Sequence, residues 1–86
     1  MAVITNVRIL DGADWVQVVT HDEEDGAWQF LPSRGPANME EAALVGLKRM
    51  VEIEPRLEEL ADLPLGWHAW RESKTGGWTR APKNAG

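Results

Sequence analysis

Cysteine is absent from the 86-residue chain, so disulfides, thiolate metal sites and thiol nucleophiles are all excluded. Long apolar runs are absent as well, because no stretch approaches the roughly 18 residues that a membrane span requires. The first ten residues, MAVITNVRIL, lack the basic region of a signal peptide and have the pattern of a strand. We therefore expect a cytoplasmic protein with no membrane partner.

Basic residues are scarce, since nine lysines and arginines stand against fourteen acidic residues and give a net charge of −5. A chain of this charge is repelled by a phosphate backbone, so we expect no nucleic-acid partner. The same charge speeds the encounter with a basic protein. Alternatively, mild acidity serves only to keep the chain soluble.

The overall composition is that of a small globular protein. Hydrophobic residues make up 43% of the chain and charged residues 27%, a balance typical of folded sequences. A chain of this length forms one domain and buries about 60–65% of its unfolded surface, so its core is thin. We expect a single α+β domain over residues 1–80 and a flexible C-terminal tail over residues 81–86.

The first third of the sequence has the pattern of strands. Three segments are rich in β-branched and aromatic residues: 3–10, 15–20 and 27–31. The pairs Asp11-Gly12 and Asp25-Gly26 stand between them and are typical of hairpin turns. This predicts three consecutive antiparallel strands.

Helical spacing follows Pro36. Asn38 and Glu41 have the spacing of a capping box. The apolar residues after them fall on one helical stripe: Met39, Ala42, Ala43, Gly46, Leu47 and Met50. This predicts a helix over residues 39–52, in which Gly46 allows the backbone to lie close against the sheet.

The rest of the chain predicts a short helix and a hairpin. Pro55 is suited to the first turn of a helix that Pro64 ends. Its buried side would consist of Leu57, Leu60 and Ala61. Residues 66–73 and 78–80 then form a hairpin around the turn KTGG. The expected fold is α+β, a mainly antiparallel five-stranded sheet in the order β-β-β-α-α-β-β with helices packed on one face.

Alternation along the strands divides the tryptophans between two faces. Trp67 and Arg71 point to one side of their strand, and His68 and Trp70 to the other. Trp67 and Trp70 therefore cannot both be core residues if the strand is regular.

The same test applies to the earlier strands. In residues 15–20 the purer apolar row is Val16, Val18 and Thr20, so we expect Trp15 and Gln17 on the open side. Trp28 and Phe30 share a face and are assigned to the core. Because helices cover one side only, one or two tryptophans are expected on the open face.

An open aromatic face is the candidate binding site, with these residues: Trp15, Gln17, Trp67, His68, Trp70 and Arg71. It predicts a non-enzymatic protein-binding module, such as a regulatory protein, whose partner is another protein or a second copy of the chain. The alternative is a small-ligand binder that stacks its ligand on the tryptophans. A third interpretation is that tryptophan pairs only stabilise the sheet, or that a bulge near Gly66 turns both rings inward.

No catalytic or metal-binding pattern is present. His21 and His68 are the only histidines, and neither Ser33 nor Ser73 lies in a nucleophile elbow. The acidic residues 22–25 lack the alternate spacing of a calcium loop and are expected to form a solvated turn. We expect no enzymatic activity, no metal and no cofactor.

Three segments within residues 22–80 occur in a distinctive order: DGAWQFL, IEPRLEELADLPLG and GGWTR. This order resembles a small bacterial family of unknown function that is sometimes grouped with the immunity proteins of polymorphic toxin systems. The matching residues are Asp25, Trp28 and Phe30 in the first segment, and Pro55, Leu60, Pro64 and Gly66 in the second. Ala27 departs from the pattern, since a glycine is frequent there. The resemblance implies an α+β binding protein with no established activity that blocks a basic toxin.

Overall fold

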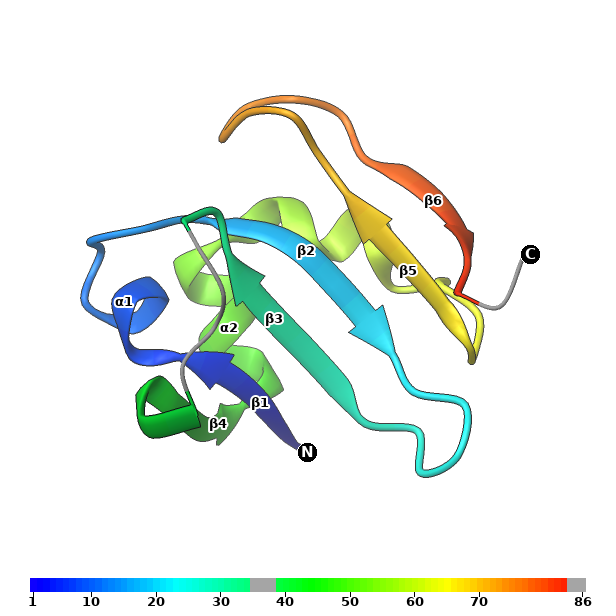
Figure 1. Ribbon diagram of the computed structural model, residues 1–86, viewed down its shortest axis with the longest axis horizontal. Helices are drawn as coiled ribbons and strands as arrows, with labels where there is room; N and C mark the ends of the chain where they lie inside the picture. The colour runs from blue at the N-terminus through cyan, green and yellow to red at the C-terminus, as the bar shows by residue number, and fades with distance from the viewer. Residues whose placement is uncertain (35–38, 84–86) are drawn as a thin grey trace.

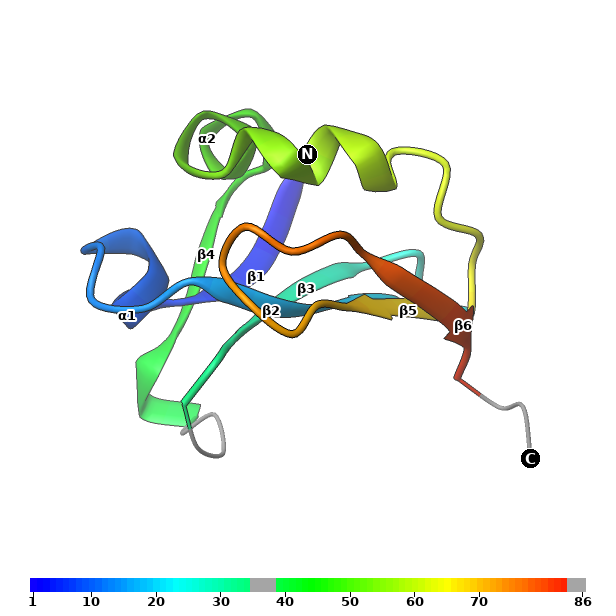
Figure 2. The same cartoon turned by 90° about the horizontal axis from the view of Figure 1, so that it is seen from above.

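A computed structural model describes residues 1–34 and 39–83 and contains one six-stranded sheet with its two longer helical segments, Leu47–Ile53 and Pro55–Leu60, on one side (Figures 1 and 2). The strands are β1 (Ala2–Asn6), β2 (Val16–His21), β3 (Trp28–Pro32), β4 (Ala42–Gly46), β5 (Trp67–Trp70) and β6 (Thr79–Pro82). The helices are α1 (Val7–Leu10) and α2 (Leu47–Ile53), with the 3-10 helices η1 (Met39–Glu41) and η2 (Pro55–Leu60). The strand order across the sheet is β4-β1-β3-β2-β5-β6. The α+β class is confirmed, but the sheet is mixed and has one strand more than expected.

The expected hairpin between the first two strands is wrong. β1 pairs in parallel with β3, where Ile4 lies opposite Gln29, and it does not pair with β2. The chain leaves the sheet early because Asn6 caps α1: its side-chain Oδ1 accepts a hydrogen bond from the Arg8 backbone N–H at 2.9 Å. Residues 7–10 therefore form a helical turn that buries Ile9, and Gly12 bends the connection to β2.

The expected helix over residues 39–52 is also wrong in its first half. Residues 42–46 form β4, which pairs antiparallel with the whole length of β1 from Ala2↔Gly46 to Asn6↔Ala42. Their small and apolar side chains fit the period of a helix as well as that of a strand. The strand forms because it pairs with the edge of β1, which would otherwise be unpaired. Gly46 is not packed against the sheet: it precedes α2, and a Cβ added there meets nothing within 4 Å. The proposed cap, Asn38, lies outside the described residues.

The other elements agree more closely with expectation. β2 and β3 form an antiparallel hairpin, as do β5 and β6. η2 buries Leu57 and Leu60, whereas Ala61 is exposed and Leu63 is buried in its place. β6 continues to Pro82, two residues into the expected tail, and residues 84–86 lie outside the described chain.

A bulge in β2 determines which side chains face the helices. The pairing with β3 shifts between Val16 and Val18, so Val16 and Val19 are both buried on the helix-covered side. The predicted core row of Val16, Val18 and Thr20 is therefore wrong beyond its first member. The core consists of Val3, Ile9, Val16, Val19, Phe30, Met50, Leu57, Leu60, Leu63 and Ala69. Trp28 and Trp67 pack against its margin.

Gly66 turns the chain from η2 into β5. Its φ is +81°, and its N–H donates a hydrogen bond to the His21 carbonyl at 2.7 Å. A Cβ at this position would lie 3.3 Å from the Glu23 Oε2 atom. Both the backbone conformation and the space therefore favour glycine.

We expect Gly66→Ala to lower the free energy of unfolding by about 1–2 kcal/mol, because an L side chain is strained in this conformation. Gly77→Ala is the matched control, since its φ is not positive and its added Cβ meets nothing within 4 Å. Urea denaturation followed by circular dichroism measures both. Equal stability of the two variants would contradict the assigned turn.

Candidate binding surfaces

The six residues predicted to form one binding site are divided by the sheet. β5 pairs with β2 so that Ala69 lies opposite the buried Val19. Trp67 and Arg71 therefore lie on the helix-covered side, and His68 and Trp70 lie on the other side, as the alternation predicts. The six predicted residues therefore do not form a single surface.

Arg71 is a buried cation rather than a binding residue. Its side chain is 0% exposed, and its Nε donates a hydrogen bond to the Val16 carbonyl at 2.9 Å. Its Nη2 lies 3.5 Å from Glu54 Oε2. A buried charge costs several kcal/mol unless it is paired. These contacts offset only part of the desolvation of Arg71, because its Nη1 and Nη2 atoms are buried and make no hydrogen bond.

Two tryptophan rings complete the surroundings of Arg71. Its Cζ lies 4.4 Å from the centre of the Trp78 ring and 5.4 Å from the centre of the Trp15 ring. Both distances are within the range of cation–π attraction. Trp15 is therefore half-buried against Arg71, and the expectation that it belongs to the open face together with Trp70 is wrong.

Trp78 and Glu54 were missed by the sequence reasoning. The Trp78 Nε1–H donates to the Arg56 carbonyl at 3.2 Å, which ties the β5–β6 hairpin to η2. Arg80 adds a second tie, because its Nη1 donates to Asp62 at 2.9 Å. One signal in the sequence could have indicated them: alternation assigns Arg71 to the core side of its strand. A buried arginine requires an acidic partner and packs among side chains that exclude water.

The uncovered side of the sheet carries no charged strand residue in the part of the chain that the structure describes. Arg80 is the one aspartate, glutamate, lysine or arginine within the six strands, and it pairs opposite Ala69 on the helix-covered side. The registers place these residues on the uncovered side: Ile4, Val18, Thr20, Gln29, Leu31, Leu44, His68, Trp70, Thr79 and Ala81. Figure 2 shows α2 and η2 on the opposite side of the sheet.

The uncovered side also displays large apolar side chains. Leu44 is 73% exposed and Ile4 36% exposed, and they lie opposite each other on β4 and β1. A hollow of about 290 Å³ lies beside them, lined by Ile4, Ala42, Ala43 and Leu44. Towards the other edge, the rings of His68 and Trp70 meet edge to face with centroids 5.1 Å apart. We call the ten residues of the preceding paragraph the open face.

Asp14 joins the start of β2 to the end of β3. Its carboxylate accepts hydrogen bonds from the Ser33 hydroxyl and from the backbone N–H groups of Trp15 and Arg34. Burial raises the pKa of Asp14, but these hydrogen bonds outweigh it and hold the pKa below its ordinary value of 3.8. The residue stabilises this corner of the sheet in its charged form.

The acidic turn and the histidines show no catalytic or metal-binding arrangement. Asp22 and Asp25 accept hydrogen bonds from the backbone N–H groups of Glu24 and Ala27, which shape the turn. His21 is held by the Leu63 carbonyl at 2.8 Å and stacks on Trp28. Among residues 1–34 and 39–83 there is no group of three or more side chains able to hold a metal ion. In the same residues no helix has the length and hydropathy to cross a membrane.

The chain matches no protein-family model, and no curated protein or solved structure is significantly similar to it. The resemblance to the immunity-like family therefore stays a prediction. A function for the chain is therefore inferred from the geometry of the two sides of the sheet.

A double-mutant cycle tests the buried ion pair. We expect Glu54→Gln to cost about 2 kcal/mol, because it leaves the Arg71 cation buried without its counter-charge. Arg71→Met keeps most of the volume, but it leaves the Val16 carbonyl without its donor and the two tryptophan rings without the cation, so it should cost about 2–3 kcal/mol. In the Arg71→Met background, Glu54→Gln should then cost less than about 0.5 kcal/mol. Urea unfolding of the four proteins gives the coupling free energy between Arg71 and Glu54. Additive effects of the two substitutions would contradict the ion pair.

The pH dependence of stability tests Asp14. Its pKa is lower in the folded than in the unfolded chain, so the carboxylate stabilises the fold above about pH 4, and this contribution disappears as the pH falls through the folded pKa. Asp14→Asn should be less stable than the wild type at pH 7, and the difference should shrink towards pH 3. Urea midpoints at the two pH values measure it. A difference that stays constant or widens in acid is incompatible with the depressed pKa.

Proposed function

We propose that this chain is a non-enzymatic protein-binding module that binds its partner through the open face. The observation that carries the proposal is the lack of any charged side chain on this face, although charged residues make up 27% of the sequence. An antiparallel sheet with one wet side normally alternates apolar and polar residues. Here Ile4, Val18, Leu31, Leu44 and Trp70 take positions where polar residues are expected.

The size of the open face is adequate for a protein partner. Six strands at about 4.8 Å spacing and about 3.3 Å per residue give a patch of roughly 24 by 16 Å. Exposed apolar patches of a few hundred Å² on small proteins are frequently interaction sites. The half-buried Trp70 provides the kind of aromatic anchor that dominates binding energies.

Charges at the margin indicate the chemistry of the partner. The turn between β2 and β3 carries Glu23, Glu24 and Asp25, all exposed, at one end of the central strands. A partner with an apolar patch bordered by basic residues would meet both features, and the net charge of −5 would speed its approach. An immunity-like role against a basic toxin is one such pairing.

The small-ligand alternative on the tryptophan face has less support. It required His68, Arg71 and Gln17 to converge on stacked rings, whereas Arg71 is buried and Trp67 and Trp70 lie on opposite sides of β5. A tryptophan that is alone on its side of β5 suits a protein contact better than a stacking pocket.

Affinity capture with matched variants tests the proposal. Leu44→Glu places a charge on the open face at a side chain that is already 73% exposed, so the fold should keep its stability within about 0.5 kcal/mol. We expect the wild type to capture a specific protein from the lysate of its source cells and Leu44→Glu to lose at least tenfold in affinity for it.

Val7→Glu is the control, because Val7 is 41% exposed but lies in α1, outside the strands. It should capture the same protein as the wild type. Capture that is equally strong with Leu44→Glu would contradict the open face as the binding surface. Sedimentation of the wild type at several concentrations shows whether the partner is another copy of the chain.

A further inference from the structure

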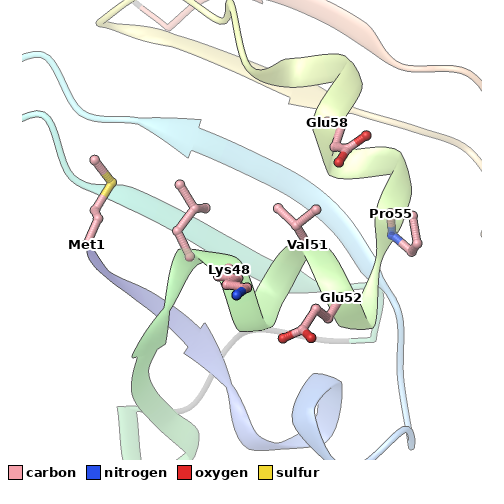
Figure 3. A pocket seen from close by; sticks show the side chains of 7 residues that line it. Met1, Lys48, Val51, Glu52, Pro55 and Glu58 are labelled. Atoms are coloured by element: carbon pink, nitrogen blue, oxygen red, sulfur yellow. The ribbon is translucent and has the colours of Figure 1, made fainter.

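A deep apolar cleft lies on the helix-covered side of the sheet, away from the open face. It consists of two adjoining cavities of about 640 and 550 Å³ between the α2–η2 segment and the strands. They share four lining residues: Met1, Leu47, Val51 and Glu58. Figure 3 shows the outer cavity, with Met1 and Glu58 on either side of Val51. We call the 550 Å³ cavity the inner cavity.

The inner cavity reaches the hydrophobic core. Four core residues line it: Val19, Phe30, Leu57 and Leu60. Trp28 forms a wall, and its ring is fixed by stacking on His21 with centroids 3.9 Å apart. The four core residues are at most 6% exposed, so the accessible wall of the cavity is formed by Met1, Trp28, Leu47 and Val51, whose open sides a ligand can contact.

The size and lining of the inner cavity match those of small-molecule sites. Such sites have volumes of about 300–1,000 Å³, mainly apolar walls and a few polar groups that orient the ligand. Here Glu58 is the only charged side chain among the lining residues. Lys48 and Glu52 line the outer cavity alone.

Glu58 has no competing partner. Within residues 1–34 and 39–83 its carboxylate makes no hydrogen bond or ion pair. A carboxylate is an acceptor only, and it prefers a charged N–H donor. The acidic chain also raises the local concentration of cations and lowers that of anions.

We propose that the inner cavity binds a small apolar molecule that carries one primary amine. Its apolar part contacts Trp28, Leu47 and Val51, and its ammonium group donates hydrogen bonds to the Glu58 carboxylate at the mouth. The site uses no residue of the open face, so it is a second function that does not depend on the protein-binding proposal.

The test compares three probes with the same ten-carbon chain: decylamine, decanol and decanoate, each below its micelle concentration. Calorimetry gives the affinities, and the indole N–H resonance of Trp28 reports occupation of the cavity. We expect decylamine to bind most tightly, decanol about tenfold more weakly and decanoate more weakly still. The Trp28 resonance should shift with decylamine.

Glu58→Gln and Glu59→Gln form the matched pair, because both are exposed glutamates of η2 and only Glu58 lines the cavity. Glu58→Gln should weaken decylamine binding about tenfold and leave decanol unchanged, whereas Glu59→Gln should change neither. Three results overturn the proposal: no binding of any probe, decanoate or decanol binding as tightly as decylamine, or equal effects of the two substitutions.

Discussion

The buried guanidinium of Arg71 is the interaction on which the C-terminal half of the structure depends. It sits directly after β5, between Trp15 and Trp78, with Glu54 as its counter-charge. These three residues come from three separate parts of the chain. The pairing therefore fixes the β5–β6 hairpin against both β2 and the α2–η2 segment. Because the hydrophobic core is small, this polar contact rigidifies a region that has few apolar side chains.

This arrangement explains how the five tryptophans are used. Trp15 and Trp78 are held by the cation, Trp28 is held by His21, and Trp67 packs at the margin of the core. Trp70 is the one directed to the open face by the register with Val18. A tryptophan-rich sequence thus places one tryptophan on the open face, where the other side chains are aliphatic, polar or, in His68, an imidazole.

The two sides of the sheet differ in chemistry as well as in cover. On the helix side, charges are paired across elements, as Arg80 is with Asp62 and Arg71 with Glu54. On the open face the strands carry no charged side chain. A wet sheet gains solubility from charge, and the lack of charge on this face is the observation behind the proposed protein contact. The apolar cleft beneath α2 and η2 is separated from that face by the sheet itself.

The sequence predicted what depends on local pattern. Alternation correctly separated Trp67 from Trp70, turn residues located the β2–β3 hairpin, and Pro55 marked the start of η2. The prediction from sequence failed where contacts with a distant segment determine the local structure. Residues 42–46 satisfy a helical stripe and become a strand only because β1 offers them an edge, and the bulge at Gln17 has no local signature. The ion pair of Arg71 with Glu54 joins residues 17 positions apart, beyond any spacing rule.

The most direct test of the open face as the binding surface is photo-crosslinking in the source cells. A photoreactive phenylalanine analogue replaces Ile4 in one protein and Glu59, an exposed residue of η2 on the other side of the sheet (Figure 2), in another, and the adducts are identified by mass spectrometry. We expect one dominant protein adduct from position 4 and none of the same protein from position 59. The same adducts from both positions, or none from position 4 while the partner is still captured, would contradict it.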